Sequence, residues 1–461
     1  MPLQIDHHTP LPDLYSLGIR QQAWCLDSAA VSRVAGAHAR LLQALEEGSQ
    51  TIYGLHTHFG HNVSAEATAH DWETHQRALL DYLCVGFGRN LDESIVRRAL
   101  RLQCHKLGLG FSGVHPQTFQ RLQKAADAEI LPTVPCLGSL GASGDLIPMA
   151  HAVREVFSDQ PPMGPRDVLA LLNTNAMMAS LAIDCWHRLQ SLQAKTSCGW
   201  LLHAEGLGWT DLGFGKIGWQ AGTVLSDDQQ QWILRTEQWQ KALQKKRAPA
   251  AATHSLTQER YSIRCAPQIF LDLEDNLSFI GRKIGEEALK LADNPIILDS
   301  GIWHGGLFYT SGLATASDLM QNALVRLCDM MDRQILLTVT PEHSHGLPAN
   351  LGSADPGDHV KGLHQLVSSI LQKIKGMSLP AHLLSFSCES NNQDIVPASM
   401  SALLLVQESL DLAEEISRIH LLIGERAFHQ RHDGIIPHAL KLAQQSSYRA
   451  ETILQEFMTL P

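Results

Sequence analysis

Apolar residues recur along most of this chain at intervals of three and four positions, the spacing that lines one face of an α-helix. Three of these stretches follow a residue that can cap a helix and end at or near a glycine, over residues 27–48, 71–86 and 92–108. Four further stretches predict long helices with an apolar face, over residues 168–194, 311–336, 357–376 and 396–423. Alternating patterns typical of strands are scarce, so the sequence predicts a mainly all-α protein.

Composition and charge narrow the classes of function. The chain has 461 residues and a net charge of −11, which favours neither nucleic acid nor an anionic membrane as a partner. Its N-terminus lacks the pattern of a signal peptide, and no stretch is expected to reach the roughly 20 apolar residues of a membrane span. Nine cysteines form no C-x-x-C pair, and the 24 histidines are not joined by a third ligand at metal-binding spacing. We therefore expect a cytoplasmic protein with reduced thiols and no metal.

Ala142, Ser143 and Gly144 form a tripeptide that can make its own electrophile. If the backbone is bent tightly, the amide nitrogen of Gly144 can attack the carbonyl carbon of Ala142, and loss of two waters leaves an imidazolone ring with a methylidene carbon from Ser143. Glycine permits the close approach because it has no Cβ, serine supplies the leaving hydroxyl, and alanine leaves the path open. The product is 4-methylideneimidazole-5-one (MIO). Taken alone, the tripeptide is more typical of an ordinary turn, so its interpretation depends on its surroundings.

Those surroundings resemble the signature of the histidine and aromatic amino-acid ammonia-lyases and their aminomutase relatives. Residues 138–151 read GSLGASGDLIPMAH, and residues 53–60 read YGLHTHFG, which is similar to the tyrosine loop of that family. Further blocks that resemble the family follow in the family's order, at residues 169–173, 258–268, 293–295, 304–306 and 389–394. The resemblance is closer to the phenylalanine and tyrosine enzymes than to the histidine enzymes.

The resemblance implies an architecture and an assembly. We expect an N-terminal catalytic domain over residues 1–200, with the MIO tripeptide and small strands near it, and a helical bundle over residues 201–461 without the shielding domain of the plant enzymes. The loop-like stretch 245–257 lies where the family has a mobile lid. The family also implies a homotetramer with sites shared between subunits, a small-molecule amino-acid substrate, and MIO formed autocatalytically from Ala142, Ser143 and Gly144.

Individual roles follow from the positions that match the family's motifs. Tyr53 is expected to be the base that removes the β-proton, and Arg264 is expected to hold the substrate carboxylate through a bidentate fork. Asn173 and Tyr261 are expected to hydrogen-bond the ring or the substrate. The predicted substrate-binding residues are Gly60, Tyr82, Leu83, Gln258, Asn294, Glu389, Asn392 and Gln393.

The residues at positions that resemble the family's specificity positions do not decide which substrate or which reaction this chain has. Leu83 and the pair Asn392-Gln393 are similar to the phenylalanine and tyrosine enzymes, whereas Tyr82 departs from the usual residue. Four further departures predict a modified specificity, at His56, His58, Thr174 and Leu307. An ammonia-lyase that converts an aromatic or related L-amino acid to an α,β-unsaturated acid is the leading interpretation. A 2,3-aminomutase and a catalytically weak homologue that acts as a binding or assembly protein are the alternatives.

Overall fold

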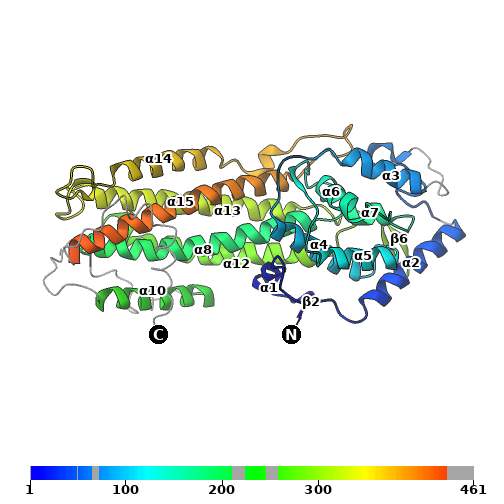
Figure 1. The fold of residues 1–461 in the computed structure, drawn as a ribbon, viewed down its shortest axis with the longest axis horizontal. Helices are drawn as coiled ribbons and strands as arrows, with labels where there is room; N and C mark the ends of the chain where they lie inside the picture. Colours follow the sequence, from blue (N-terminus) through cyan, green and yellow to red (C-terminus); the bar gives the residue numbers. More distant parts are fainter. Residues whose placement is uncertain (1, 49, 65–71, 210–223, 246–257, 433–461) are drawn as a thin grey trace. The chain divides into compact units, whose positions relative to one another are not determined.

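The computed structural model describes residues 2–48, 50–64, 72–209, 224–245 and 258–432 (Figure 1). These residues are mainly helical, which confirms the predicted fold class. The helices are α1 (Leu11–Ser16), α2 (Ala30–Glu47), α3 (Trp72–Leu83), α4 (Glu93–Gly108), α5 (Pro116–Ala126), α6 (Leu146–Val156), α7 (Asp167–Leu172), α8 (Ala176–Gly206), α10 (Asp227–Lys245), α11 (Tyr261–Arg264), α12 (Ala266–Leu289), α13 (Ser311–Val339), α14 (Lys361–Gly376) and α15 (Ser399–His432).

Small two-stranded sheets accompany the helices. Parallel β1 (Leu3–Gln4) and β2 (Trp24–Cys25) form one of them. Antiparallel β3 (Phe87–Asn90) and β4 (Pro135–Leu137) form another, and β5 (Ile296–Leu298) pairs with β6 (Gly301–Trp303) in a hairpin. Because β4 ends directly before the glycine-rich segment that contains the tripeptide, the expectation of small strands near it is confirmed.

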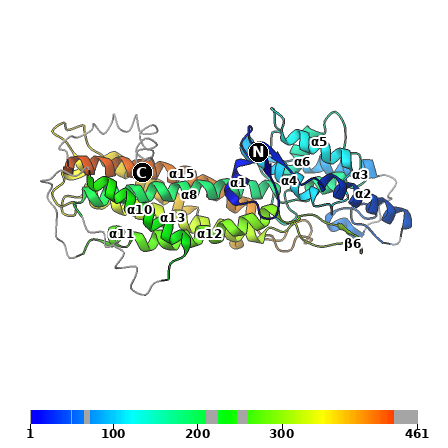
Figure 2. The same ribbon diagram turned by 90° about the horizontal axis from the view of Figure 1, so that it is seen from below.

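Contacts divide the chain into two compact units that interleave along the sequence. Unit 1 consists of the described residues within 1–187, 280–318 and 379–406, and unit 2 of those within 188–279, 319–378 and 407–432. In unit 1, helices α2 to α7 pack against one another (Figure 1). Unit 2 contains the later part of α8, the first part of α12, and the later parts of α13 and α15. These parts run side by side (Figure 2). The predicted boundary at residue 200 falls within α8, and the division into 1–200 and 201–461 stays a prediction.

Most of the predicted helices are present. The stretches 27–48 and 92–108 correspond to α2 and α4, and the three stretches in the second half of the chain correspond to α13, α14 and α15. The stretch 71–86 corresponds to α3, although its expected cap, Asp71, lies outside the described residues. The expected lid at 245–257 lies outside them too, apart from Lys245.

The prediction of one continuous helix over residues 168–194 is wrong. Helices α7 and α8 are separated by three residues that begin with Asn173. The carbonyl of Thr174 in this break accepts the amide of Asp145 at 2.5 Å, and the Asp145 carboxylate accepts the amide of Met177 at 2.7 Å. Because the first amides of α8 bind a side chain from another segment, the helix starts anew there.

One long apolar segment corrects an expectation from the sequence. Residues 167–206 are long and apolar enough to cross a membrane, although no such stretch was expected. However, 94% of the apolar window within them is buried inside the structure. The core helix of a globular protein passes the same test of length and composition, so this feature alone is a weak indication of a membrane span.

A buried ion pair fixes the segment before β5. Arg166 donates from two guanidinium nitrogens to the carboxylate of Asp293, at 2.6 and 3.0 Å, and both side chains are at most 1% exposed. The same carboxylate accepts the amide of Asn294 at 2.7 Å. This fork is the strong, geometrically specific form of an ion pair, so it positions the backbone of Asn294, a predicted site residue.

We expect Asp293→Ala to lower the free energy of unfolding by about 3–5 kcal/mol, because it leaves the buried guanidinium of Arg166 without a counter-charge. Asp299→Ala is the matched control: its carboxylate pairs with Arg40 and is 92% exposed, so we expect a change below about 1 kcal/mol. Urea denaturation of both variants measures the difference. Equal losses would contradict the stabilising role of the buried pair.

Candidate active site

A pocket of about 570 Å³ in unit 1 includes the tripeptide in its lining. Helices α3 and α6, the residue that follows α7, and the segment before α15 contribute to its lining. The predicted site residues that line it are Tyr53, Gly60, Tyr82, Leu83, Ala142, Ser143, Gly144, Asn173, Asn294, Glu389, Asn392 and Gln393. The fold therefore brings together residues from motifs that are far apart in the sequence. Gln258, Tyr261 and Arg264 belong to unit 2 and do not line this pocket.

Glycine conformations bend the backbone around the tripeptide. Gly141 and Gly144 have φ values of +77° and +73°, in the left-handed region that strains residues with a Cβ. A Cβ on Gly144 would collide with the carbonyl of Thr174. Glycine is therefore required by the turn itself as well as by the close approach that cyclisation needs.

Side chains from neighbouring segments hold this turn. Asn173 Nδ2 donates to the carbonyl of Ser143 at 2.9 Å, and Ser139 Oγ donates to the carbonyl of Gly144 at 3.0 Å. Across the described part of the chain, no hydrogen bond engages the amide of Gly144 or the carbonyl of Ala142. The turn is thus fixed around the two groups that would react, and both are left available.

A strained segment presents the side chain of Gln393 to the tripeptide. Glu389 and the two residues after it have φ values of 51°, 53° and 64°, an unusual run for residues other than glycine. Gln393 Nε2 donates to Ser143 Oγ at 3.1 Å and to a carboxylate oxygen of Glu389 at the same distance. Asn392 Nδ2 donates to that carboxylate oxygen at 2.8 Å. Strain of this kind is concentrated at functional sites, and here it places an amide on the hydroxyl that would leave.

The hydroxyl of Tyr53 accepts the amide of Gly60 at 2.8 Å. Burial raises the pKa of Tyr53 above its ordinary value; the Gly60 amide opposes this, and the charge of Glu389 adds to it. The amide of Tyr53 donates to His304 Nε2 at 3.1 Å, which requires a lone pair on that nitrogen. Partial burial, together with the nearby Tyr53 and Glu389, raises the pKa of Tyr82 to about 12. With these neighbours alone, both phenols are stable in their protonated form.

The profile of the aromatic amino acid lyases matches this chain over residues 11–457. The chain belongs to the aromatic amino acid lyase family.

Individual relatives agree with the family assignment. A histidine ammonia-lyase of Gloeobacter violaceus is 29% identical over 85% of this chain and 80% of its own length. A tyrosine ammonia-lyase of Cupriavidus metallidurans is 26% identical over 92% of this chain and 87% of its own. The crystal structure of a tyrosine aminomutase from Streptomyces globisporus has the same fold, with a TM-score of 0.84 and 21% identity over 99% of this chain and 98% of that one. The predicted family and its lyase class are confirmed, whereas these identities do not select a substrate.

The charged side chains in the described lining of the pocket are acidic. Among the described residues that line it, none is Lys, Arg or His, and Glu389 and Asp394 are acidic. A substrate carboxylate would therefore find no cation in it. The arginine that the family's motif predicts for this task, Arg264, belongs to α11 of unit 2 and is not among the lining residues.

Helix α11 is itself firmly held. Trp200 Nε1 and Gln334 Nε2 donate to two of its main-chain carbonyls, at 2.9 and 2.7 Å. The guanidinium of Arg264 lies over the ring of Tyr261, 4.5 Å from its centre, and Tyr261 is 70% exposed. Within unit 2, the two predicted site residues thus lie together, with Tyr261 exposed. Trp200 and Gln334 were not predicted, because one apolar and one polar residue on long helices carry no signal in the sequence.

Four residues that differ from the family's usual ones were expected to change specificity: His56, His58, Thr174 and Leu307. None of them is among the described residues that line the pocket. His56 accepts a main-chain amide at 3.0 Å, and the buried hydroxyl of Thr174 accepts another at 3.3 Å at the start of α8. These two are therefore explained by local backbone structure. The main chain of Thr174 nevertheless helps to hold the turn.

The sequence did not predict three hydroxyl-bearing residues that contact the turn or one another. Ser139 binds the turn as described above, Thr310 Oγ1 donates to the carbonyl of Gly141 at 3.0 Å, and Ser399 is hydrogen-bonded to Thr310. Ser139 could have been found, because it lies within the GSLG stretch that opens the motif. Thr310 and Ser399 lie at the starts of α13 and α15, where such residues are ordinary helix caps.

Gly60 offers a test of the geometry that does not depend on activity. Its φ is +61°, and a Cβ there would collide with the carboxylate of Glu389. We expect Gly60→Ala to lower the free energy of unfolding by about 1–3 kcal/mol, the usual cost of such strain. Gly362→Ala is the control, because it lies in α14 with open space around it and alanine favours a helix. Chemical denaturation that finds Gly60→Ala as stable as the wild type would disprove this packing.

Proposed function

We propose that this chain is an MIO-dependent ammonia-lyase of the cytoplasm that removes ammonia from an aromatic or related L-amino acid and releases an α,β-unsaturated acid. The observation that carries this proposal is the bent Ala142-Ser143-Gly144 turn, which lines the same pocket as the phenol of Tyr53. The proposal has three further parts: formation of MIO, the base with its partner subunit, and the position of the substrate side chain.

The turn suits formation of MIO. The amide of Gly144 and the carbonyl of Ala142 have no hydrogen-bond partner among the described residues, so neither must be released before they react. Asn173 binds the carbonyl of Ser143, and Gln393 donates to the hydroxyl that leaves. When formed, MIO supplies an electrophilic carbon to which the substrate amine can add, so that nitrogen becomes a better leaving group.

Tyr53 is proposed as the base for the β-proton. Because burial raises its pKa, the phenolate needs stabilisation beyond the amide of Gly60. The described pocket residues supply no positive charge. We therefore propose that Arg264 and Tyr261 of a partner subunit complete the site in a homotetramer, where Arg264 would hold the substrate carboxylate by a bidentate fork and favour the phenolate.

The substrate side chain is proposed to lie against the apolar part of the lining. Leu79, Leu83, Leu146, Ile147 and Leu169 contribute to it. Phenylalanine or tyrosine suits such a surface, whereas an imidazole would lose hydrogen bonds that Leu83 cannot replace. Tyr82 could donate to a polar substituent on the ring. A 2,3-aminomutase would use the same residues and return the ammonia to the neighbouring carbon, so the products distinguish the two reactions.

The purified chain should weigh two waters less than its sequence mass, because MIO formation releases two waters. Ser143→Ala should lose this deficit and nearly all activity, since it has no leaving hydroxyl. Ser368→Ala is the control, because its hydroxyl bonds Asp332 in unit 2, and it should keep the deficit. Intact-protein mass spectrometry measures all three. A wild type at its full sequence mass would refute the mechanism and favour the binding-protein alternative.

Tyr53→Phe should fold and mature but lose kcat by about 10²–10⁴-fold, the usual contribution of a general base. Arg264→Lys should raise KM as well as lower kcat, because a point charge cannot reproduce the fork. Tyr15→Phe is the control, since its ring stacks on His187 away from the pocket lining. Steady-state kinetics on the preferred substrate decide this. Near-normal turnover in Tyr53→Phe would move the base to another residue.

Histidine should have a kcat/KM at least about tenfold below that of phenylalanine or tyrosine, because an unpaired buried imidazole costs about 1–3 kcal/mol. Product analysis on these three amino acids and on non-aromatic ones, with ammonia and β-amino acid both measured, tests this. Preferred turnover of histidine would contradict the role of Leu83. A β-amino acid product would instead establish the aminomutase.

A further inference from the structure

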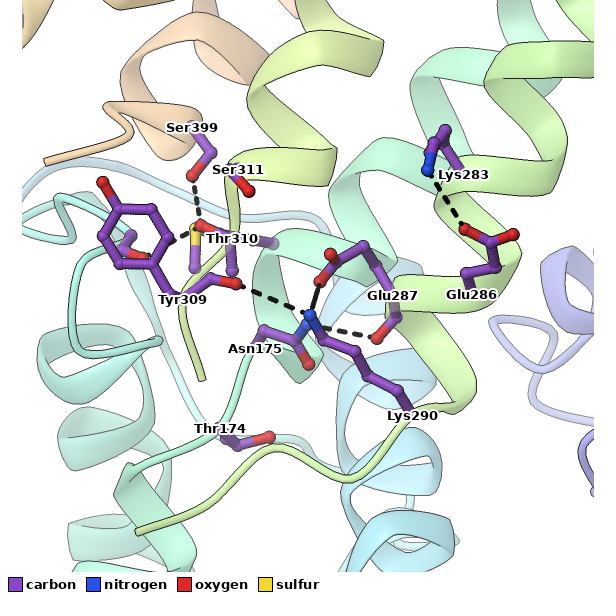
Figure 3. A network of polar contacts seen from close by, with 12 residues as sticks. Thr174, Asn175, Lys283, Glu286, Glu287, Lys290, Tyr309, Thr310, Ser311 and Ser399 are labelled. Carbon is purple, nitrogen blue, oxygen red and sulfur yellow. Dashed lines mark hydrogen bonds and ion pairs between the residues drawn. The ribbon is translucent and has the colours of Figure 1, made fainter. Parts of the chain in front are cut away.

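Two buried hydroxyls, those of Thr310 and Ser399, are bonded to each other (Figure 3) and lie against Gly141, the residue before the tripeptide. Thr310 and Ser399 are both fully buried. Thr310 Oγ1 also donates to the carbonyl of Gly141, at 3.0 Å. A hydroxyl has one proton, so when Thr310 donates to Gly141, Ser399 must donate to Thr310. The two hydroxyls form a directed chain that ends on the peptide group joining Gly141 to Ala142.

The side chain of Thr310 does not cap its own helix. The carbonyl of Thr310 accepts the amides of Leu313 and Ala314, at 3.0 and 3.2 Å, so Thr310 lies where a helix cap belongs at the start of α13. A threonine at that position usually accepts an amide of its own helix. Here its hydroxyl donates to another segment instead. Lys290 Nζ contacts the carbonyl of Tyr309 at 3.5 Å and helps to hold the backbone beside it (Figure 3).

The residue before Ser399 has a strained backbone conformation. Ala398, directly before Ser399, has a φ of 54°, which is unfavourable for a residue with a Cβ. Gly141 completes the fit, because a Cβ on it would collide with the hydroxyls of both Ser399 and Thr310. The hydroxyl pair therefore lies in direct contact with the backbone of the turn, and no side chain could intervene.

We propose that Thr310 and Ser399 are positioning residues for the self-cyclisation of the tripeptide. This inference rests on the proposed function and deepens it. Thr310 holds the turn on its N-terminal side at Gly141, while the amide of Asp145, bonded to Thr174 at 2.5 Å, holds it on its C-terminal side. The residues between these two clamps have little freedom to unbend, so the reacting atoms stay near each other.

The step that the clamps favour balances without a co-reactant. The amide nitrogen of Gly144 forms a bond to the carbonyl carbon of Ala142. The carbonyl oxygen leaves as water with the amide protons of Gly144 and Ser143. The hydroxyl of Ser143 leaves as a second water with the Cα proton of the same residue. Thr310 and Ser399 exchange no atoms, and their effect is confined to geometry.

The test compares the rate at which variants lose two waters. Thr310→Val keeps the shape but removes the donor, and we expect maturation to slow by at least about tenfold, as for a misplaced reacting group. Thr310→Ser restores the hydroxyl and should mature close to the wild-type rate, and Ser399→Ala should fall between them. Thr196→Val is the control, because its buried hydroxyl bonds Leu192 within α8, and it should mature normally.

Intact-mass spectra, taken at intervals after protein synthesis is stopped, give the rates, and circular dichroism confirms that each variant is folded. If the wild type shows no deficit, the proposed function and this inference both fail. If the wild type shows the deficit and Thr310→Val matures equally fast, only this inference fails. Should Thr310→Val not fold, Ser399→Ala decides, and maturation at the wild-type rate would overturn the inference.

Discussion

The structure of the pocket depends on the bonds between Asp145 and the start of α8. The Asp145 carboxylate accepts amides of that helix, and the Asp145 amide donates to the carbonyl of Thr174 in the break before it. These bonds end the apolar helical run at Asn173 and bring that side chain to the carbonyl of Ser143. Burial raises the pKa of Asp145 to about 7, and the two helix amides and the nearby Lys106 oppose that rise. A continuous helix here would leave neither the bent tripeptide nor its amide partner in place.

The pocket contains several of the groups that the proposed reaction requires. It contains a turn that can cyclise, a tyrosine whose phenolate could accept a proton, and an acidic side chain at Glu389, yet no cation among the described lining residues. Tyr261 and Arg264 are held together on α11, and the hydrogen bonds that fix this helix come from unit 2 alone. In the proposed homotetramer, Arg264 of a partner subunit would supply the cation that the described lining lacks.

The sequence predicted the parts of this protein that obey local rules. Apolar spacing found α2, α4 and the long helices after residue 300, and the motifs contain many of the residues that line the pocket. The spacing of apolar residues did not predict the break at Asn173. The break depends on the hydrogen bond from the amide of Met177 to the carboxylate of Asp145, a residue in another segment of the chain. Thr310 and Ser399 were missed since a hydroxyl at a helix start already has an ordinary explanation. His56 and Thr174 bind local backbone and are not among the described residues that line the pocket, so their expected effect on specificity stays a prediction.

The central claim is that the tripeptide becomes an electrophile inside this pocket, and a covalent trap tests it most directly. The folded wild type would be treated with a small nucleophile such as cyanide, digested, and mapped by tandem mass spectrometry. We predict an adduct on the carbon derived from Ser143, on a peptide that has lost two waters, and none in Ser143→Ala. An unlabelled peptide over Ala142–Gly144 at its full sequence mass would contradict the account.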